Sequence, residues 1–188
     1  MKIGVLALQG DFAKHESILR ELNVEAMQIK YPEELKICSG LIIPGGESTT
    51  ISMQMDYIGI RKKIIDFAKE HPVFGTCAGL VMLSTQLEDS RIQTLDLMDI
   101  TVSRNAWGRQ VHSFVDDVSL SFSNSKPFGA VFIRAPKIDK VGNDITVLSE
   151  YQSEPVIVTN GKHLAASFHP ELGNDTRIHK YFLELIND

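Results

Sequence analysis

One cysteine of this sequence stands in a pattern that makes thiols reactive. Cys77 lies in Gly75-Thr76-Cys77-Ala78-Gly79, which follows the apolar pair Val73-Phe74 and precedes an apolar helical pattern. Glycines on both sides permit the tight strand-to-helix turn that exposes a nucleophile. A helix start at such a turn favours the thiolate, and the Ala78 N–H would face an oxyanion. A buried structural cysteine in a glycine-rich turn is the alternative.

A histidine and a carboxylate near the end of the sequence could serve this thiol. A nucleophile needs a base, and the base needs an orienting group. Ser167-Phe168-His169-Pro170-Glu171-Leu172 offers both. Pro170 biases His169 toward extended geometry, and residues two apart in an extended chain face the same side. We therefore predict that Glu171 binds one ring nitrogen of His169 while the other nitrogen faces Cys77, as in a triad. A surface turn with an unrelated histidine is the alternative.

Two loops after apolar runs could complete a site. Ile43-Pro44-Gly45-Gly46-Glu47-Ser48-Thr49-Thr50 precedes a predicted helix, so its free N–H groups could hold an anion or oxyanion. It is not a Walker loop, because no Gly-Lys-Ser/Thr follows; an ordinary turn is the alternative. Gln9-Gly10 ends the first apolar run. Ligands of open α/β sheets bind beyond the carboxyl ends of the strands, so Gln9, Gly46 and Cys77 should meet at one edge.

Alternating apolar runs and helical patterns predict the sheet that would position these residues. Strands are expected at 3–8, 24–29, 41–43, 73–74, 100–102, 118–122, 131–133, 145–148, 156–159 and 164–168, and helices at 12–22, after 50, at 60–68, from 80 and from 175 to 186. Asn160-Gly161 predicts a hairpin turn. This order predicts the α/β class, a three-layer doubly wound fold whose central sheet is mostly parallel and flanked by helices. Without a repeat or linker, residues 1–188 are predicted to form a single domain.

Composition argues against several classes of function. The net charge of −5 comes from 24 acidic and 19 basic residues without a long run of either sign, so no basic footprint for nucleic acid exists. The apolar run at 3–8 is too short for a signal peptide or a membrane span. Two cysteines are too few for a disulfide framework and indicate a reducing compartment. We expect a cytoplasmic protein in which Cys38, without an elbow or a basic partner, is an inert thiol.

The other histidines have no catalytic pattern. His15 follows Asp11 by four residues and could form a metal pair on a helix, but no third ligand is nearby. The polar face of a helix start is the simpler interpretation. His71, His163 and His179 are expected on the surface. The sequence therefore predicts neither a metal nor an organic cofactor.

The glycine-rich loop, the cysteine elbow and the late His-Pro-Glu, in this order and spacing, resemble the class I glutamine amidotransferases. Within them, the glutaminase subunits of pyridoxal 5′-phosphate synthases are similar over essentially the whole chain. The matching segments are Leu8-Gln9-Gly10, Pro44-Gly45-Gly46-Glu47-Ser48-Thr49-Thr50, Phe74-Gly75-Thr76-Cys77-Ala78-Gly79, Arg104-Asn105, Gly108-Arg109-Gln110, Phe132-Ile133-Arg134-Ala135-Pro136 and Ser167-Phe168-His169-Pro170-Glu171-Leu172. The chain departs from the family at Asn105-Ala106-Trp107-Gly108, where Ser or Ala followed by Phe or Tyr is expected, and at His112, where Asp or Gly is common. These departures leave the roles of Trp107 and His112 open; packing is the simplest one for Trp107.

The resemblance implies a role for each matching residue. Cys77 would be the nucleophile, with His169 and Glu171 completing the catalytic triad. Glutamine would be bound by Gly45, Gly46, Glu47, Arg104, Ile133 and Arg134. From their positions in the loop and the elbow, the N–H groups of Gly46 and Ala78 would hold the oxyanion, and Gln9, at the end of the first strand beside that site, could couple it to a partner. On sequence alone, either arginine could instead lie on the surface or in an ion pair, although a bidentate guanidinium suits the substrate α-carboxylate.

The resemblance also implies a flavodoxin-like fold and a partner. L-glutamine would be hydrolysed to glutamate and ammonia without a cofactor. The ammonia would pass to a (β/α)₈-barrel synthase subunit, in a large hetero-oligomeric complex, for pyridoxal 5′-phosphate (vitamin B6) synthesis; neither nucleic acid nor membrane would be bound.

Two alternatives fit the sequence less well. The glutaminase of a histidine-pathway cyclase would share the triad but should lack Arg104-Asn105 and Phe132-Ile133-Arg134-Ala135-Pro136. A non-catalytic binding protein on the same fold would be expected to lose Cys77 or His169, and both are present.

Overall fold

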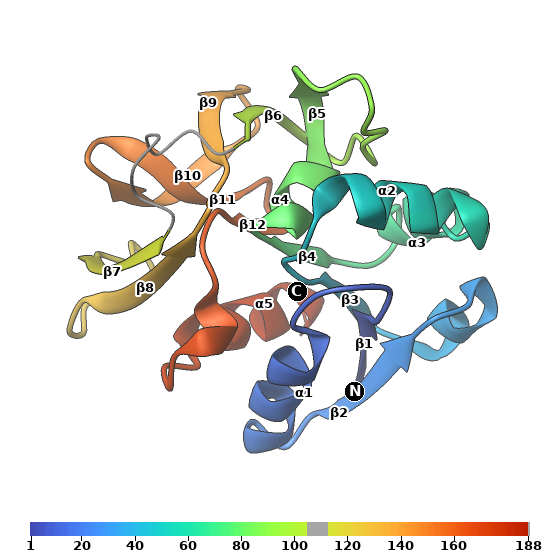
Figure 1. The fold of residues 1–188 in the computed structure, drawn as a ribbon. Coiled ribbons are helices and arrows are strands. Elements are labelled where there is room, and N and C mark those ends of the chain that lie inside the picture. The colour runs from blue at the N-terminus through green and yellow to red at the C-terminus, as the bar shows by residue number, and fades with distance from the viewer. Residues whose placement is uncertain (105–112, 188) are drawn as a thin grey trace.

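A central sheet of seven strands, in the order β10-β11-β12-β4-β3-β1-β2, organises the molecule (Figure 1). The structure, a computed structural model, describes residues 1–104 and 113–187. The strands are β1 (Lys2–Leu6), β2 (Glu25–Ile29), β3 (Gly40–Ile43), β4 (Val73–Thr76), β10 (Thr146–Tyr151), β11 (Glu154–Thr159) and β12 (Leu164–Ala166). From β12 to β2 all neighbours are parallel, whereas β11 and β10 are antiparallel.

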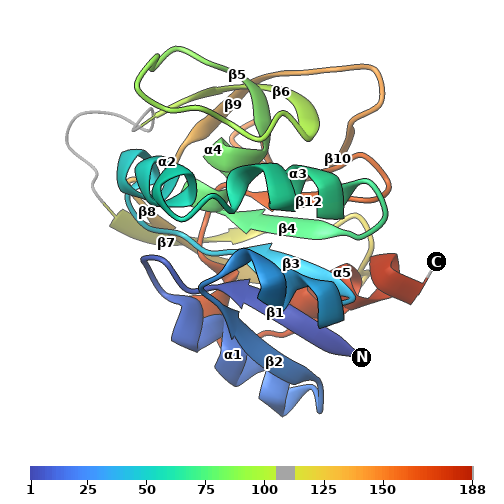
Figure 2. The ribbon, with the colours of Figure 1, turned by 90° about the vertical axis from the view of Figure 1, so that its right-hand side faces the viewer.

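Helices cover both faces of this sheet and give three layers (Figure 2). One face carries α1 (Phe12–Glu21) and α5 (Arg177–Asn187), and the other carries α2 (Ser48–Tyr57), α3 (Arg61–Ala68) and α4 (Ala78–Leu83). Within β3, Ile42 belongs to the core under α5, whereas Leu41 and Ile43 belong to the core under α4. Because strand side chains alternate between faces, a strand covered on both sides must be continuously apolar. The predicted fold class is confirmed.

Two small sheets extend the central one. The first joins β5 (Ser84–Leu87), β6 (Met98–Ser103) and β9 (Lys137–Val141), and the second is the hairpin of β7 (Ser113–Val118) and β8 (Phe128–Ile133). Met98 and Ile138 pack into the core on the α4 side, and Val118 and Phe128 pack into the core on the α5 side. The β8 hairpin and β9 therefore bring the segment between them, around Arg134, against the central sheet.

Most predicted elements are confirmed, including the turn at Asn160-Gly161, which joins the antiparallel strands β11 and β12. The strand predicted at 118–122 is wrong, because β7 ends at Val118 and a turn follows. Leu120 there is buried, and Phe122 stacks on Tyr181 of α5 with ring centroids 4.3 Å apart. The apolar residues that predicted a strand, Leu120 and Phe122, therefore belong to a loop that packs against the core and α5. Strands β5, β7 and β9 were not predicted, and nor were the short 3₁₀ turns η1 (Pro32–Ile37) and η2 (Pro170–Leu172).

Three further expectations concern Cys38, membrane-spanning helices and the pair Trp107 and His112. Cys38 is buried, and its thiol lies 3.6 Å from the Glu34 carbonyl oxygen, as an inert packed thiol would. None of the helices in the described ranges has both the length and the apolar character needed to cross a membrane. The questions raised about Trp107 and His112 concern residues outside the described ranges.

Candidate active site

Cys77 occupies a strained turn between β4 and α4. Its φ of 50° and ψ of −106° lie in a region that residues with a side chain rarely adopt. The Cys77 N–H donates to the Ala166 carbonyl of β12 at 2.8 Å, which fixes the turn to the sheet. A Cβ at Gly79 would lie 1.9 Å from the Ile43 carbonyl oxygen, and one at Gly75 would lie 2.5 Å from the Gly79 carbonyl. Both glycines are therefore required by the close approach of α4 to the sheet.

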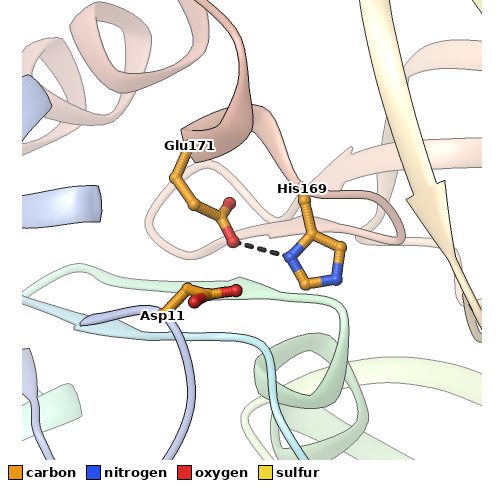
Figure 3. Close-up of side chains that lie close together, drawn as sticks. All are labelled: Asp11, His169 and Glu171. Carbon is orange, nitrogen blue, oxygen red and sulfur yellow. Dashed lines mark hydrogen bonds and ion pairs between the residues drawn. The ribbon is translucent and has the colours of Figure 1, made fainter. Parts of the chain in front are cut away.

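His169 and Glu171 form a tight pair beside this turn (Figure 3). His169 Nδ1 lies 2.6 Å from Glu171 Oε1, and both side chains are nearly inaccessible to solvent. His169 itself is non-helical, with φ of −106° and ψ of 83°, as inferred from Pro170. The extended path expected from His169 to Glu171 is wrong, because Pro170 opens the 3₁₀ turn η2 and this turn folds Glu171 back against the ring. The two side chains meet by a different local route from the one expected.

Cys77 and His169 face the same point at the end of β3. A Cβ at Gly45 would lie 2.4 Å from Cε1 of His169 and 3.3 Å from Cβ of Cys77. Burial lowers the pKa of His169, but hydrogen bonds and negative charge from Cys77 and Glu171 outweigh burial and raise this pKa to about 10. An imidazolium therefore stands beside the Cys77 sulfur at neutral pH. This is the charge arrangement of an activated Cys–His nucleophile.

A cavity of about 330 Å³ opens over this pair, within the range of small-molecule sites. It is lined by Cys77 and His169, by Gln9 and Ala78, and by every residue expected to bind glutamine, namely Gly45, Gly46, Glu47, Arg104, Ile133 and Arg134. Glu171 does not line it and lies behind His169. The structure thus brings together, at the carboxyl edge of the parallel strands, side chains from distant parts of the chain.

Gln9 holds the loop that faces Cys77. Its Oε1 accepts the Glu47 N–H at 2.7 Å, and a Cβ at Gly46 would lie 2.7 Å from the same oxygen. Glu47 in turn caps α2 by accepting the N–H groups of Thr49 and Thr50 at 3.0 and 2.7 Å. Burial raises the Glu47 pKa, but the hydrogen bonds from Thr50 and Thr49 bring the pKa down to about 2. The peptide between Gly46 and Glu47 is therefore fixed by one side chain from the β1 loop.

The two arginines of the cavity differ in their surroundings. Arg104 Nη1 lies 2.6 Å from Asp89 Oδ2, and Arg104 Nη2 lies 3.4 Å from Glu47 Oε1. Arg134 is exposed and has a positive φ of 42°, which places an unusual backbone conformation at the cavity wall. Asp89 was not predicted, because nothing in its local sequence marks it as the partner of Arg104.

Three histidines are buried rather than exposed, so the sequence predictions for them are wrong. His15, His163 and His179 are at most 5% accessible, whereas His71 is partly exposed. His163 Nδ1 accepts the Val73 N–H at 3.1 Å. His15 has Nδ1 3.0 Å from His179 Nε2, and His15 Nε2 lies 3.4 Å from Glu171 Oε2. Ile18 and Leu19, three and four residues after His15 in α1, were a usable signal that His15 shares their buried face.

A second carboxylate, that of Asp11, lies near the His169–Glu171 pair. Asp11, His169 and Glu171 offer ligand atoms within 4.8 Å of one another (Figure 3). Nδ1 of His169 is already bound to Glu171, and the opposite ring nitrogen belongs to the side of Cys77. A catalytic pair accounts for this grouping without a metal ion.

Known proteins are similar to this chain over nearly its full length. The model of the SNO glutamine amidotransferase family matches residues 5–188. Pyridoxal 5′-phosphate synthase subunit PdxT of Thermotoga petrophila is 46% identical over 187 residues, which are 99% of this chain and 100% of that protein. The protein of the same name from Pseudothermotoga lettingae is 49% identical, covering 98% of this chain and 95% of that protein.

Solved structures are similar too. A crystal structure of a glutamine amidotransferase has a TM-score of 0.93 with 41% identity and covers 99% of each chain. PurLQS from Thermotoga maritima, at 15% identity and a TM-score of 0.69 over 99% of this chain and 96% of that one, shares the fold alone.

Proposed function

Because this chain belongs to the SNO glutamine amidotransferase family, it is a glutaminase that supplies ammonia for pyridoxal 5′-phosphate synthesis, and we propose that Cys77, His169 and Glu171 are its catalytic triad. One observation carries the proposal. Cys77 and His169 line the same cavity, and Glu171 holds the ring nitrogen that faces away from that cavity at 2.6 Å. Relatives that share nearly the full length are named as one subunit of a synthase, so the chain works with a synthase subunit.

In the first half-reaction, the Cys77 sulfur attacks the side-chain amide carbon of glutamine. The oxyanion lies against the N–H groups of Gly46 and Ala78, which is the kind of preorganised donor pair that stabilises acyl transfer. His169, protonated at neutral pH, gives its proton to the departing amine, so that ammonia leaves and a glutamyl thioester remains.

In the second half-reaction, His169 changes from acid to base. The pKa of His169 is raised in part by Cys77. Once the sulfur is acylated it carries no negative charge and accepts no hydrogen bond from the ring, so this part of the increase disappears. The neutral imidazole can then take a proton from water, which hydrolyses the thioester to glutamate. Glu171 keeps the ring oriented in both steps.

Substrate recognition is assigned to the other cavity residues. Gly45, Gly46, Glu47 and Ile133 form the walls, and the guanidinium groups of Arg104 and Arg134 supply positive charge. Since Arg104 is already engaged by Asp89 and Glu47, we assign the glutamine α-carboxylate chiefly to Arg134. The Glu47 carboxylate, ionised well below neutral pH, is a suitable partner for the α-ammonium group.

The first test removes the proposed carboxylate partner. Arg134→Ala should raise KM for glutamine about 10- to 100-fold with a smaller change in kcat, because a charge-assisted hydrogen bond to the bound substrate is lost. Arg134→Lys should recover only part of the affinity, since lysine cannot bind bidentately. Arg20→Ala, which removes an exposed arginine of α1 outside the cavity, is the control. An unchanged KM in Arg134→Ala would remove Arg134 from the site.

The second test concerns coupling to the synthase subunit. We propose that the chain alone is a poor glutaminase, because an always-active enzyme would lose ammonia as ammonium, and that docking sets the Gly46 peptide through Gln9. Gln9→Ala removes the acceptor of the Glu47 N–H. A misplaced oxyanion donor lowers rates by about 10²–10³. In the Gln9→Ala variant, the stimulation by the partner should therefore fall by about the same factor, while the rate without the partner is unchanged. Glutamate release at saturating glutamine, with and without partner, measures this.

Gln86→Ala on β5 is the matched control, because Gln86 is outside the cavity. Full stimulation of the Gln9→Ala variant would contradict a role of Gln9 in coupling but would leave the glutaminase assignment intact.

The proposal also covers the kind of partner subunit and the assembly. We propose a (β/α)₈-barrel synthase subunit, a large hetero-oligomeric complex and a cytoplasmic location, with residues 1–188 acting as one domain. Mixing the chain with a candidate synthase subunit and following glutamine-dependent formation of pyridoxal 5′-phosphate tests the assignment directly. Formation that proceeds only with added ammonium, and never with glutamine, would exclude that pairing.

A further inference from the structure

The triad carboxylate has a second oxygen that the catalytic histidine does not use. Glu171 Oε1 binds His169, whereas Oε2 is buried, makes no hydrogen bond of standard geometry and lies 3.4 Å from Nε2 of His15. Nδ1 of His15 lies 3.0 Å from Nε2 of His179. Both of these histidines are fully buried, His15 on α1 and His179 on α5. A continuous line of polar atoms thus leads from the cavity wall to two helices behind it.

The environment keeps both of these histidines neutral. Burial, followed by the nearby His179 and His169 rings, holds the pKa of His15 well below its ordinary value. Burial alone lowers the pKa of His179 to about 3. Each ring therefore carries one N–H and one bare nitrogen at neutral pH, and the surroundings decide which is which.

One arrangement of protons satisfies the contacts. With the proton on Nε2, His179 donates to Nδ1 of His15, and His15 donates from Nε2 to the Thr76 hydroxyl at 3.2 Å, with Glu171 Oε2 beside the same N–H at 3.4 Å. The reverse arrangement would set the bare Nε2 of His15 against a carboxylate oxygen. It would also move the His179 proton to Nδ1, which is buried without a partner, and an orphaned donor is unfavourable.

We propose that His15 is a positioning residue of the glutaminase reaction, whose Nε2–H faces Oε2 of Glu171 at 3.4 Å and holds the carboxylate by this electrostatic contact, and that His179 fixes the proton of His15. This inference rests on the proposed triad. Because Oε1 is bound by His169 and Oε2 faces the His15 N–H, rotation of the carboxylate away from His169 is opposed at both oxygens. Because His15 is neutral, its N–H faces the carboxylate without cancelling the negative charge that His169 needs.

The test compares two substitutions that separate packing from hydrogen bonding. His15→Phe keeps a buried ring and loses the N–H, whereas His15→Gln loses the ring and keeps an N–H at similar reach. In the chain assayed with its synthase subunit, His15→Phe should lower kcat about 10- to 100-fold with KM for glutamine unchanged. His15→Gln should restore most of that loss. A residue that only filled space would give the opposite order, and that order would overturn the proposal.

Two controls sharpen the comparison. His163→Phe makes the same substitution at another buried histidine, which binds the Val73 N–H and does not line the cavity, and kcat should be unchanged. In a Glu171→Gln background, which is expected to be slower but active, His15→Phe should add no further loss, because the two residues act through one contact. Losses that multiply in the double variant would contradict the proposal.

A measurement on the unaltered protein covers the case in which His15→Phe does not fold. ¹⁵N NMR of histidine-labelled wild type should show His15 and His179 as neutral rings protonated at Nε2 at pH 7. A His15 ring that is charged or protonated at Nδ1 would overturn the assignment without any variant. A wild type that is inactive together with its synthase subunit, or an active Cys77→Ala variant, would instead contradict the proposed function itself.

Discussion

Replacing Cys77 with alanine should lower glutamate release about 10⁵- to 10⁶-fold, the loss seen when a covalent nucleophile is removed from a triad. Without the sulfur no thioester can form, and the remaining oxyanion donors can only assist direct attack by water. The φ of 50° at this position is equally unfavourable for alanine, so the folded state should be affected little. Glutamate release at saturating glutamine, with the synthase subunit present, measures the effect.

Cys38→Ala is the matched control, since the chain has only these two cysteines. Cys38 is packed behind β1, and burial raises the pKa of its thiol. The variant should keep nearly the full rate. A diazo-ketone analogue of glutamine should label Cys77 and leave Cys38 untouched. Labelling of Cys38, or substantial activity in Cys77→Ala, would falsify the assignment of the nucleophile.

The parallel core could be predicted because its physical cause is local. Strands covered by helices on both sides must be apolar at every position, and β1 and β3 carry that pattern in a few consecutive residues. The glycines around Cys77 were equally visible, since Gly75 and Gly79 stand where no Cβ fits. Sequence and structure agree wherever one short segment determines the conformation.

The parts that were missed depend on contacts between distant segments. Asp89 binds Arg104 across a small sheet whose strands β5 and β9 have no distinctive pattern of their own. His15 and His179 meet only because α1 and α5 lie on the same face of the sheet. Histidines occur both in protein interiors and on surfaces, so the residue type alone did not indicate burial.

The pair of His169 and Glu171 lies between these cases. Its two residues are close in sequence, and their proximity was expected, but the 3₁₀ turn that joins them was not. Pro170 is compatible both with an extended chain and with the first position of a helical turn. In the observed turn, Phe168 and Glu171 are both buried.

His169→Asn should lower kcat by a similar order to Cys77→Ala, about 10⁵- to 10⁶-fold, because one ring serves as acid and base in both half-reactions. His71→Asn, at a partly exposed histidine outside the cavity, should leave the rate unchanged. Asparagine keeps a polar group beside Glu171 but cannot transfer a proton at neutral pH. Retention of a tenth of the wild-type rate by His169→Asn would exclude His169 as the base.

The pH profile of the wild type gives a second, independent check on His169. Its pKa in the free enzyme is raised to about 10, above the ordinary value of about 6.5. The imidazolium is therefore present throughout the neutral range and is lost as the pH rises through about 10. Since ammonia release needs that proton, loss of the His169 proton should cause no decline of kcat/KM in the neutral range, and any decline should begin only at alkaline pH, where the substrate α-ammonium group also ionises. A wild-type alkaline limb near pH 7 would mean that Cys77 and Glu171 do not hold the proton on His169, and the charge arrangement derived for the site would be wrong.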